Sequence, residues 1–188
     1  SEYYAYQVAK NMGIDAIPYN LAKWKGNLCS ICEIFKKKKL SFVPIGYLKT
    51  KGGMSAVEEY YEKLGSSYVK ALRDMIVFDA LICNVDRHFG NFGVLVDNEA
   101  NKIVAPAPLF DHGNSLFNFA WADDWESDEN LENYISTLQP SVYDEFMESA
   151  KRVLTAEHRV MLQKLLTFRF KKHPRYNLPN KRLKMIER

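Results

Sequence analysis

The sequence predicts an α+β fold that is mainly helical, and three observations support this class. Apolar residues recur at helical spacing near both ends of the chain. Extended apolar segments are confined to residues 14–35 and to a hairpin over residues 92–104. Capping residues and glycines separate the helical segments. Strands should therefore appear only near the start of the chain and in its middle.

The first third of the chain should form a helix followed by two strands. Residues 1–12 are typical of a helix, because their apolar side chains share one face and Gly13 can close the carboxyl end. Residues 14–24 and 27–35 then predict two strands, which Lys25-Gly26 separates.

The middle of the chain should contain two helices before the hairpin. A capping box that begins at Ser55 predicts a helix over residues 55–64. The next helix should begin near Ser67 and continue through an almost wholly apolar stretch. On this helix we expect Asp74 to be exposed and Asp79 to tie down the loop that follows.

The last third should be helical and end in a basic tail. Residues 142–154 and 155–166 each have an apolar helical face, and Thr155 can cap the second helix. From Arg169 onward cations predominate and prolines interrupt any helix, so we expect a solvated tail. Without interleaved aromatic residues beyond Tyr176, we expect no direct binding of nucleic acid.

Two charged segments lack a regular period. Lys36-Lys37-Lys38-Lys39 is a dense positive run, for which we expect a solvated loop or a surface that attracts phosphate. Aromatic and acidic side chains share residues 117–132. There we expect a flexible loop or lid, or a surface for a basic substrate or for the basic face of a DNA-binding partner.

Two polar stretches carry the clearest chemical pattern. Asn84-Val85-Asp86-Arg87-His88-Phe89-Gly90-Asn91 follows the apolar helix, and Leu109-Phe110-Asp111-His112-Gly113-Asn114 follows the hairpin. Asp, Asn and Gly are common in surface turns, but a surface turn does not need a buried helix to deliver it. The first Asp can accept a proton from an attacking hydroxyl, while an Asn and a second Asp supply the hard oxygen ligands that Mg²⁺ prefers. The pattern predicts phosphoryl transfer from a nucleotide.

The stretch from Phe78 to Leu116 contains Asn-x-Asp-Arg-His-x-x-Asn and then Ala-Pro-x-x-x-x-Asp-His-Gly. It resembles the C-terminal lobe of HipA-like serine/threonine kinases, bacterial kinases often found as toxins of toxin-antitoxin pairs. The resemblance implies ATP and Mg²⁺ as cofactors and a protein substrate with a Ser or Thr hydroxyl. It implies that Asp86 is the catalytic base, that His88 and Asn91 lie at the nucleotide and metal, and that Asp111 is the main Mg²⁺ ligand.

The same resemblance implies supporting roles. Arg87 and His88 would complete the catalytic group by fixing the loop, although Arg87 could simply pair with a nearby carboxylate. The backbone of Glu33-Ile34-Phe35 would hold adenine as the hinge strand; the alternative is an ordinary core strand. Glu2 would form an ion pair with the phosphate-binding Lys of the family. The alternative is that Glu2 only complements the dipole of its own helix.

The resemblance also implies a division of the chain. The sequence contains no glycine-rich phosphate cradle, so residues 1–35 would be a remnant of the amino-terminal lobe with its hinge strand, and residues 36–188 the helical kinase-like C-terminal lobe. Another polypeptide could supply the missing lobe, and an antitoxin is a further candidate partner. Two alternatives stay open: a nucleotide-binding or regulatory module without catalysis, and a lipid kinase, because Asp-Arg-His-x-x-Asn also resembles the catalytic loop of phosphoinositide kinases.

Composition limits the remaining classes. The chain has 188 residues, of which 47% are hydrophobic, enough for a substantial core, and its net charge of +3 is too small to signal nucleic acid. No apolar run approaches a membrane span and no secretory signal opens the sequence, so we expect a cytoplasmic protein without a membrane partner. Cys29, Cys32 and Cys83 lie in apolar segments, where buried free thiols are expected rather than a zinc site.

Overall fold

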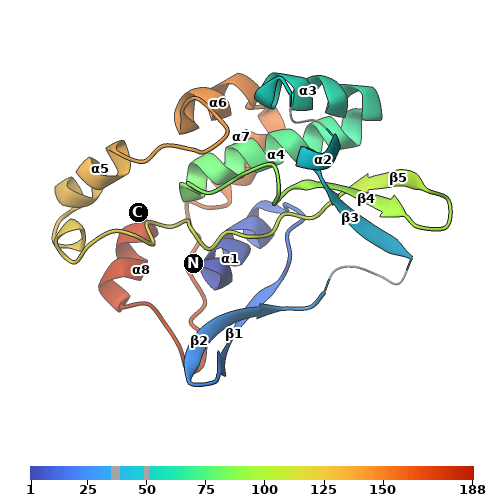
Figure 1. The fold of residues 1–188 in the computed structure, drawn as a ribbon. Coiled ribbons are helices and arrows are strands. Elements are labelled where there is room, and N and C mark those ends of the chain that lie inside the picture. Colours follow the sequence, from blue (N-terminus) through green and yellow to red (C-terminus); the bar gives the residue numbers. More distant parts are fainter. Residues whose placement is uncertain (35–38, 49–50) are drawn as a thin grey trace.

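The computed structural model describes residues 1–34, 39–48 and 51–188, and it combines helices with two small antiparallel sheets (Figure 1). The helices are α1 (Glu2–Met12), α2 (Ile45–Leu48), α3 (Gly53–Leu64), α4 (Ser66–Ile82), α5 (Asp128–Ser136), α6 (Phe146–Val153), α7 (Ala156–Gln163) and α8 (Asn180–Ile186), with a 3₁₀ turn η1 (Asp123–Trp125). The strands are β1 (Tyr19–Trp24), β2 (Asn27–Cys32), β3 (Leu40–Pro44), β4 (Gly93–Asp97) and β5 (Lys102–Pro106). The mixed, mainly helical class predicted from the sequence is confirmed.

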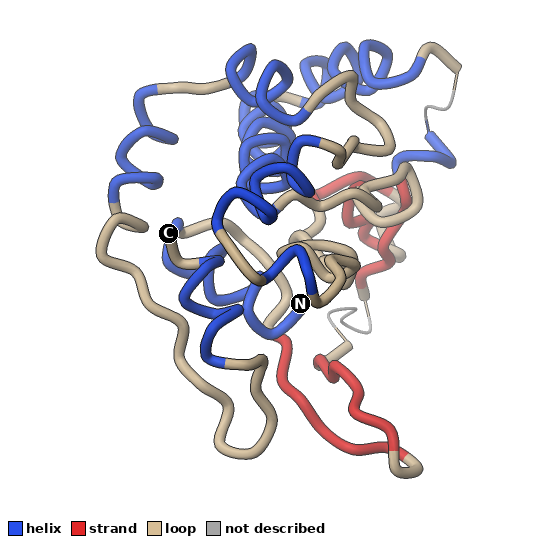
Figure 2. The backbone as a smooth tube through the Cα atoms, turned by 90° about the vertical axis from the view of Figure 1, so that its left-hand side faces the viewer, coloured by secondary structure: helices blue, strands red, loops and turns tan. Residues whose placement is uncertain are grey.

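The two sheets lie in different parts of the molecule. Strands β1 and β2 form a ribbon in which Tyr19 is opposite Cys32, and Figure 2 shows this ribbon projecting from the body of the protein. Strands β3, β4 and β5 form the second sheet in that order. Its β4–β5 hairpin confirms the hairpin predicted over residues 92–104 and connects the two polar stretches of the sequence.

Helices α1 and α4 supply much of the main core. Helix α1 buries the apolar face predicted from the sequence, and Gly13 closes it in the left-handed conformation with φ of 83°. Helix α4 is buried over most of its second half, including Met75, Ile76 and Phe78. Because α4 is held in the core, its carboxyl end is a rigid support for the loop that follows.

The strand predicted over residues 14–24 is shorter than expected, and so is the one predicted over 27–35. Pro18 has no N–H to donate to a sheet, and β1 begins only after it. Residues 15–17 instead pair with Leu109. The Ile17 N–H donates to Leu109 O at 2.8 Å, and the Leu109 N–H donates to Asp15 O at 2.9 Å. This pairing fixes the start of the second polar stretch to the α1–β1 connection.

Two predictions on the central helices are wrong. Helix α3 begins at Gly53 rather than at Ser55, whose side chain makes no cap, because Gly52 and Gly53 adopt positive φ and turn the chain two residues earlier. Asp74 is buried, since His158 on α7 lies against it with Nε2 3.0 Å from Asp74 Oδ1. Short-range periodicity could not indicate a neighbour 84 residues away.

The acidic segment 117–132 is not an irregular lid over its whole length. It contains η1 and the start of α5, whose Ser127 side chain accepts a hydrogen bond from the Asn130 backbone at 3.1 Å. Trp125 is buried, with the Arg182 guanidinium 4.2 Å from its ring centroid. This packing gives the segment regular structure that its composition did not indicate.

The carboxyl-terminal third has shorter helices than predicted and no solvated tail. Helices α6 and α7 span only the centres of the predicted ranges 142–154 and 155–166, while the Thr155 cap on α7 is confirmed. Beyond them α8 buries Leu183 and Met185. The predicted tail is therefore folded against the body of the protein.

The remaining sequence predictions concern single residue types. All three cysteines are free, but none is buried as predicted: Cys29 and Cys83 are half-buried and Cys32 is exposed. Within residues 1–34, 39–48 and 51–188, β1 is the only strand that pairs with β2, so the ribbon that carries Cys29 and Cys32 lies outside the core. Phe35 and Lys36-Lys37-Lys38 lie outside the described residues, and Lys39 pairs with Glu99 at 3.1 Å.

Among the described helices, none has the length and hydropathy needed to cross a membrane.

Candidate active site

The first polar stretch begins where α4 ends. Cys83 adopts a left-handed conformation with φ of 48°, and Asn84 N–H donates to Asp79 O at 2.9 Å. The Asn84 side chain also donates to Asp79 Oδ1 at 3.0 Å and accepts from Asp86 N–H at 3.3 Å. The helix end therefore sets the direction in which Asp86 leaves the core.

Asp79 and Arg87 form a wholly buried ion pair beneath this loop. Arg87 Nε lies 2.8 Å from Asp79 Oδ2 and Arg87 Nη2 lies 2.9 Å from Asp79 Oδ1, a two-bond geometry typical of Arg–carboxylate pairs. Burial alone would lower the pKa of Arg87, but the Asp79 carboxylate more than offsets this effect and raises it. The predicted role of Asp79 in tying down the loop is confirmed.

Arg87 joins the first polar stretch to the second. Its Nη1 donates to Asn91 O at 3.2 Å and to Phe110 O at 2.9 Å, and its Nη2 lies 3.1 Å from His112 Nδ1. Burial, together with the Arg87 charge, holds the pKa of His112 well below its usual value, so neutral Nδ1 accepts from Arg87. Because Arg87 is fully buried, we assign it a positioning role rather than a catalytic one.

Asp86 is half-buried and faces the second polar stretch. Its Oδ2 accepts a hydrogen bond from Asn114 Nδ2 at 2.8 Å, and Val85 N–H donates to Asn114 O at 3.2 Å. Within the described part of the chain, Oδ1 of Asp86 accepts no hydrogen bond. One carboxylate oxygen is thus oriented by the protein, and the other is available.

Asn91 closes the first polar stretch on itself. Its Nδ2 donates to Asp86 O at 3.0 Å and its Oδ1 accepts from His88 N–H at 3.0 Å, while only 2% of the residue is exposed. His88 is exposed, and its Nδ1 accepts from Gly90 N–H at 3.0 Å. The Asn91 amide therefore braces the loop, and the imidazole of His88 lies at the surface.

Asp111 presents its carboxylate to solvent from a left-handed backbone with φ of 60°. Its N–H donates to the Tyr19 hydroxyl at 3.2 Å. Burial raises the pKa of Tyr19 to about 12, with a smaller opposing effect from this bond, so the hydroxyl stays protonated at neutral pH. The Asp111 carboxylate forms no hydrogen bond or ion pair with any residue of the described ranges, which leaves both oxygens free for a ligand.

Glu2 is buried beside the same loop. An added Cβ on Gly113 would lie 3.7 Å from Glu2 Oε1, and Glu2 Oε2 is buried without a hydrogen-bond partner among the described residues. Burial raises the pKa of Glu2; the backbone of His112 opposes this shift and the nearby Asp111 charge adds to it. A buried carboxylate with an unpartnered oxygen is costly unless a cation pairs with it.

Several supporting residues were missed from the sequence. Asn114 and Tyr19 orient the two Asp-bearing loops, Ser141 Oγ donates to Val85 O at 2.5 Å, and the buried Tyr143 hydroxyl lies 3.4 Å from Asp79 Oδ2. Asn114 could have been noticed because it directly follows Asp-His-Gly. Tyr19, Ser141 and Tyr143 have no local signal, because they reach the site only through the tertiary fold.

The predicted hinge is only partly described. Glu33 and Ile34 follow β2 as exposed, irregular chain rather than as the predicted strand, and Phe35 lies outside the described residues. No three or more His, Cys, Asp or Glu side chains in the described ranges are close enough to hold a metal ion. Mg²⁺ commonly needs only one or two protein carboxylates besides phosphates and water.

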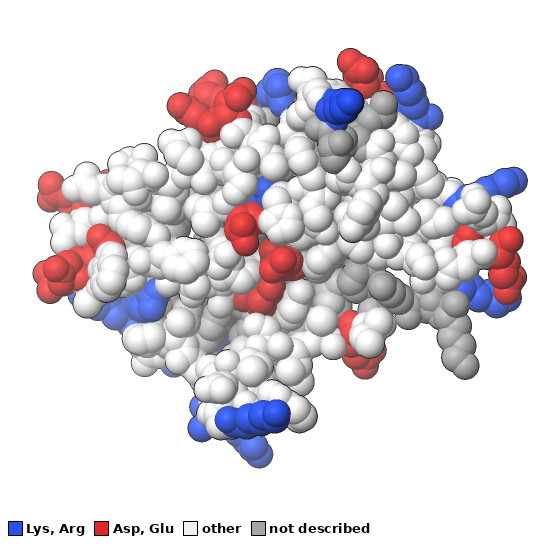
Figure 3. Space-filling model, viewed as in Figure 1, with Lys and Arg blue, Asp and Glu red and all other residues white. Residues whose placement is uncertain are grey.

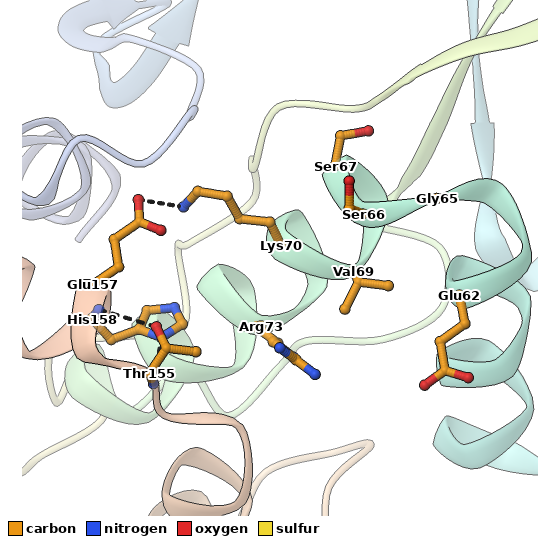
Figure 4. Close-up of a pocket in the computed structure, with 10 residues that line it drawn as sticks. All are labelled: Glu62, Gly65, Ser66, Ser67, Val69, Lys70, Arg73, Thr155, Glu157 and His158. Carbon is orange, nitrogen blue, oxygen red and sulfur yellow. Dashed lines mark hydrogen bonds and ion pairs between the residues drawn. The ribbon is translucent and has the colours of Figure 1, made fainter.

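A large open cavity lies elsewhere, at the start of α4 (Figure 4). It has a volume of about 630 Å³, and none of the predicted site residues lines it. Lys70 reaches across it to Glu157 at 3.0 Å and also pairs with Asp74. The charge of Lys70 is thus already neutralised by Glu157 and Asp74. The cavity does not belong to the site of Asp86 and Asp111.

The fold is similar to that of a solved kinase. The crystal structure of the Helicobacter pylori proinflammatory kinase CtkA superposes with a TM-score of 0.71 and 18% sequence identity, covering 100% of this chain and 79% of that chain. No protein-family model matches the sequence, and no curated protein matches it. At this identity the likeness shows the fold alone, which is kinase-like.

Proposed function

We propose that this chain is the catalytic part of an ATP- and Mg²⁺-dependent serine/threonine protein kinase of the HipA-like type. The observation that supports this most strongly is the joining of two Asp-bearing loops by Arg87 and Asn114. On a kinase-like fold, this arrangement would allow a base and a metal ligand to share one rigid support.

Asp86 would act as the catalytic base. Asn114 holds Oδ2, so the free Oδ1 can accept the proton of a Ser or Thr hydroxyl without loss of orientation. The backbone around Asp86 is fixed from below by Asn84 and from the side by Asn91. Exposed His88 would contact the nucleotide.

Asp111 would be the main protein ligand of Mg²⁺. Its exposed, unpartnered carboxylate is the hard oxygen donor that this ion prefers, so the residues fit the metal. The Asn91 amide is already engaged within its loop, and any contact with the metal would be additional to that role. Bound Mg²⁺ would neutralise charge on the β- and γ-phosphates of the nucleotide.

Residues 1–35 would belong to the amino-terminal lobe and residues 36–188 to the C-terminal lobe. The unpartnered Oε2 of Glu2 supports this division, because a phosphate-binding Lys from the rest of the amino-terminal lobe would satisfy it. The backbone of Glu33 and Ile34 would hold adenine. By its resemblance the chain would act as a toxin whose partner is an antitoxin.

Transfer of the γ-phosphate tests this proposal. The full-length gene product is incubated with labelled ATP, Mg²⁺ and a dephosphorylated protein substrate, and phosphoserine and phosphothreonine are measured. Asp86→Asn should lower the rate by about 10²- to 10⁴-fold. Asp144→Asn, the same change at an exposed residue, should leave the rate unchanged. Equal rates in both variants would refute the assignment, and transfer only to phosphatidylinositol vesicles would favour a lipid kinase.

A further inference from the structure

A second surface of distinct chemistry lies on the free end of the β1–β2 ribbon and on the chain that precedes α8. We refer to it as the basic ribbon surface. It comprises Lys23, Trp24, Lys25, Lys171, Lys172, Arg175 and Tyr176. No part of the proposed phosphotransfer mechanism uses these residues.

The chain before α8 is held against α1, and one contact joins it to the ribbon. Lys171 and Gln7 of α1 bond each other twice, at 2.7 Å through the Lys171 N–H and at 3.0 Å through its carbonyl. Lys23 Nζ lies 6.0 Å from the centroid of the Tyr176 ring. Segments that are about 150 residues apart in the sequence thus form one surface.

The charge of this surface is uncompensated. Residues 23–26 and 171–176 contain five Lys and Arg residues and no carboxylate. In the part of the chain that the structure describes, none of these five cations forms an ion pair. Figure 3 shows the blue side chains of Lys and Arg gathered at the bottom of the molecule, over the tip of the ribbon. A concentration of unpaired cations of this kind attracts polyanions.

Aromatic rings lie among the cations. Trp24 is 66% exposed at the end of β1, and Lys25 Nζ lies 5.9 Å from its ring centroid. Tyr176 stacks on His173 with a centroid distance of 5.3 Å and an interplanar angle of 11°. Cations that follow a phosphate backbone, together with exposed rings on which bases stack, are the features by which proteins hold single-stranded nucleic acid.

We propose that the basic ribbon surface binds single-stranded nucleic acid, with phosphates on the cations and a base stacked on Trp24. This revises the expectation drawn from the sequence, in which Tyr176 had no aromatic neighbour among the basic residues. In the folded chain, Trp24 at the end of β1 belongs to the same surface as these basic residues. The five residue steps from Tyr19 to Trp24 separate the tip from the Asp111 loop by roughly 16 Å along the ribbon, so binding is independent of the proposed phosphotransfer.

Fluorescence anisotropy with a labelled 12-nucleotide oligouridylate tests the proposal on the full chain. If all five cations contact phosphates, the logarithm of the affinity should fall with the logarithm of salt concentration with a slope of about −3.5. Trp24→Ala should weaken binding roughly 5- to 150-fold, and Trp24→Tyr should retain most of it. Because Trp24 is exposed, neither change removes a core side chain.

A matched pair of charge reversals completes the test. Lys25→Glu combined with Lys172→Glu should abolish binding, whereas Lys63→Glu combined with Lys184→Glu, an equal change of net charge at exposed residues elsewhere, should reduce it only slightly. Equal losses in the two double variants, or an affinity that Trp24→Ala leaves unchanged, would overturn the proposal. Binding to polyglutamate or to phosphatidylserine vesicles with no binding of the oligonucleotide would also overturn it.

Discussion

The buried ion pair between Asp79 and Arg87 gives the sharpest prediction for stability. Asp79→Asn keeps the shape of the side chain and removes its charge, which leaves the Arg87 guanidinium in the core without a counter-charge. Both side chains are fully buried, so solvent cannot replace the lost interaction. Removal of one partner from such a pair costs about 3–5 kcal/mol of unfolding free energy.

Urea denaturation followed by circular dichroism measures this loss directly. A domain of this size should also lose about 2–4 °C in melting temperature for each kcal/mol. Glu148→Gln is a control, because it breaks the exposed Glu148–Lys151 pair and should cost less than about 1 kcal/mol. Arg87 also bonds Asn91 O and Phe110 O, so Arg87→Met has a cost of its own, but that cost should be smaller in the Asp79→Asn background than in the parent, because no buried charge is then left unpaired.

The reasoning would be refuted if Asp79→Asn cost no more than the surface control. It would also be refuted if Arg87→Met cost as much unfolding free energy in the Asp79→Asn variant as it does in the parent. Either result would mean that Arg87 does not depend on Asp79 for its charge compensation. The two loops would then need another support.

Three further predictions concern Asp111, Glu2 and Thr155. Asp111→Asn should lower phosphotransfer more at limiting than at saturating Mg²⁺, which a titration of rate against Mg²⁺ would reveal; equal loss at all concentrations would argue against a metal ligand. Burial raises the pKa of Glu2 above its ordinary value of 4.5, so the folded chain binds this proton more tightly than the unfolded chain. The stability that Glu2 contributes is therefore present below pH 4.5 and is lost as the pH rises from there through the raised pKa. Glu2→Gln should therefore be more stable than the parent at pH 7, with the difference shrinking toward pH 4 in urea titrations, and a constant difference would contradict the raised pKa. Thr155→Ala should cost about 0.5–2 kcal/mol because it removes the cap of α7, and Thr155→Ser should restore most of that loss by the same denaturation assay.

Local sequence signals predicted the parts of the fold that depend on local physics. The apolar face of α1 and its Gly13 terminus, the Thr155 cap and the β4–β5 hairpin all follow from short-range periodicity and capping chemistry. The role of Asp79 could be predicted because it lies in the apolar segment directly before the first polar stretch, where a buried carboxylate needs a partner.

The failures share one physical cause, which is packing between segments far apart in the sequence. Asp74 on α4 is packed against His158 of α7, and the chain after Arg169 is held by contacts such as the one between Gln7 of α1 and Lys171. The position of Arg87 between two loops likewise depends on Phe110, which is 23 residues away. No local pattern contains these partners.

The candidate site shows the same division. Its residue types could be predicted from the two polar stretches, but their roles depended on hydrogen bonds. The sequence did not reveal that Arg87 is enclosed beneath the loop, that the Asn91 amide bonds the backbone of Asp86, or that Asn114 orients Asp86. The motifs of the two polar stretches therefore identified the loops. Only the fold distinguished the residues that position the loops from those with free ligand atoms.

Calorimetric titration of the chain with ATP, with and without Mg²⁺, tests the central claim most directly. If Asp86 and Asp111 border one nucleotide–metal site, ATP should bind more tightly when Mg²⁺ is present. Asp111→Asn should abolish that enhancement, while Asp144→Asn should preserve it. Mg²⁺-dependent binding of equal strength in both variants would contradict the account.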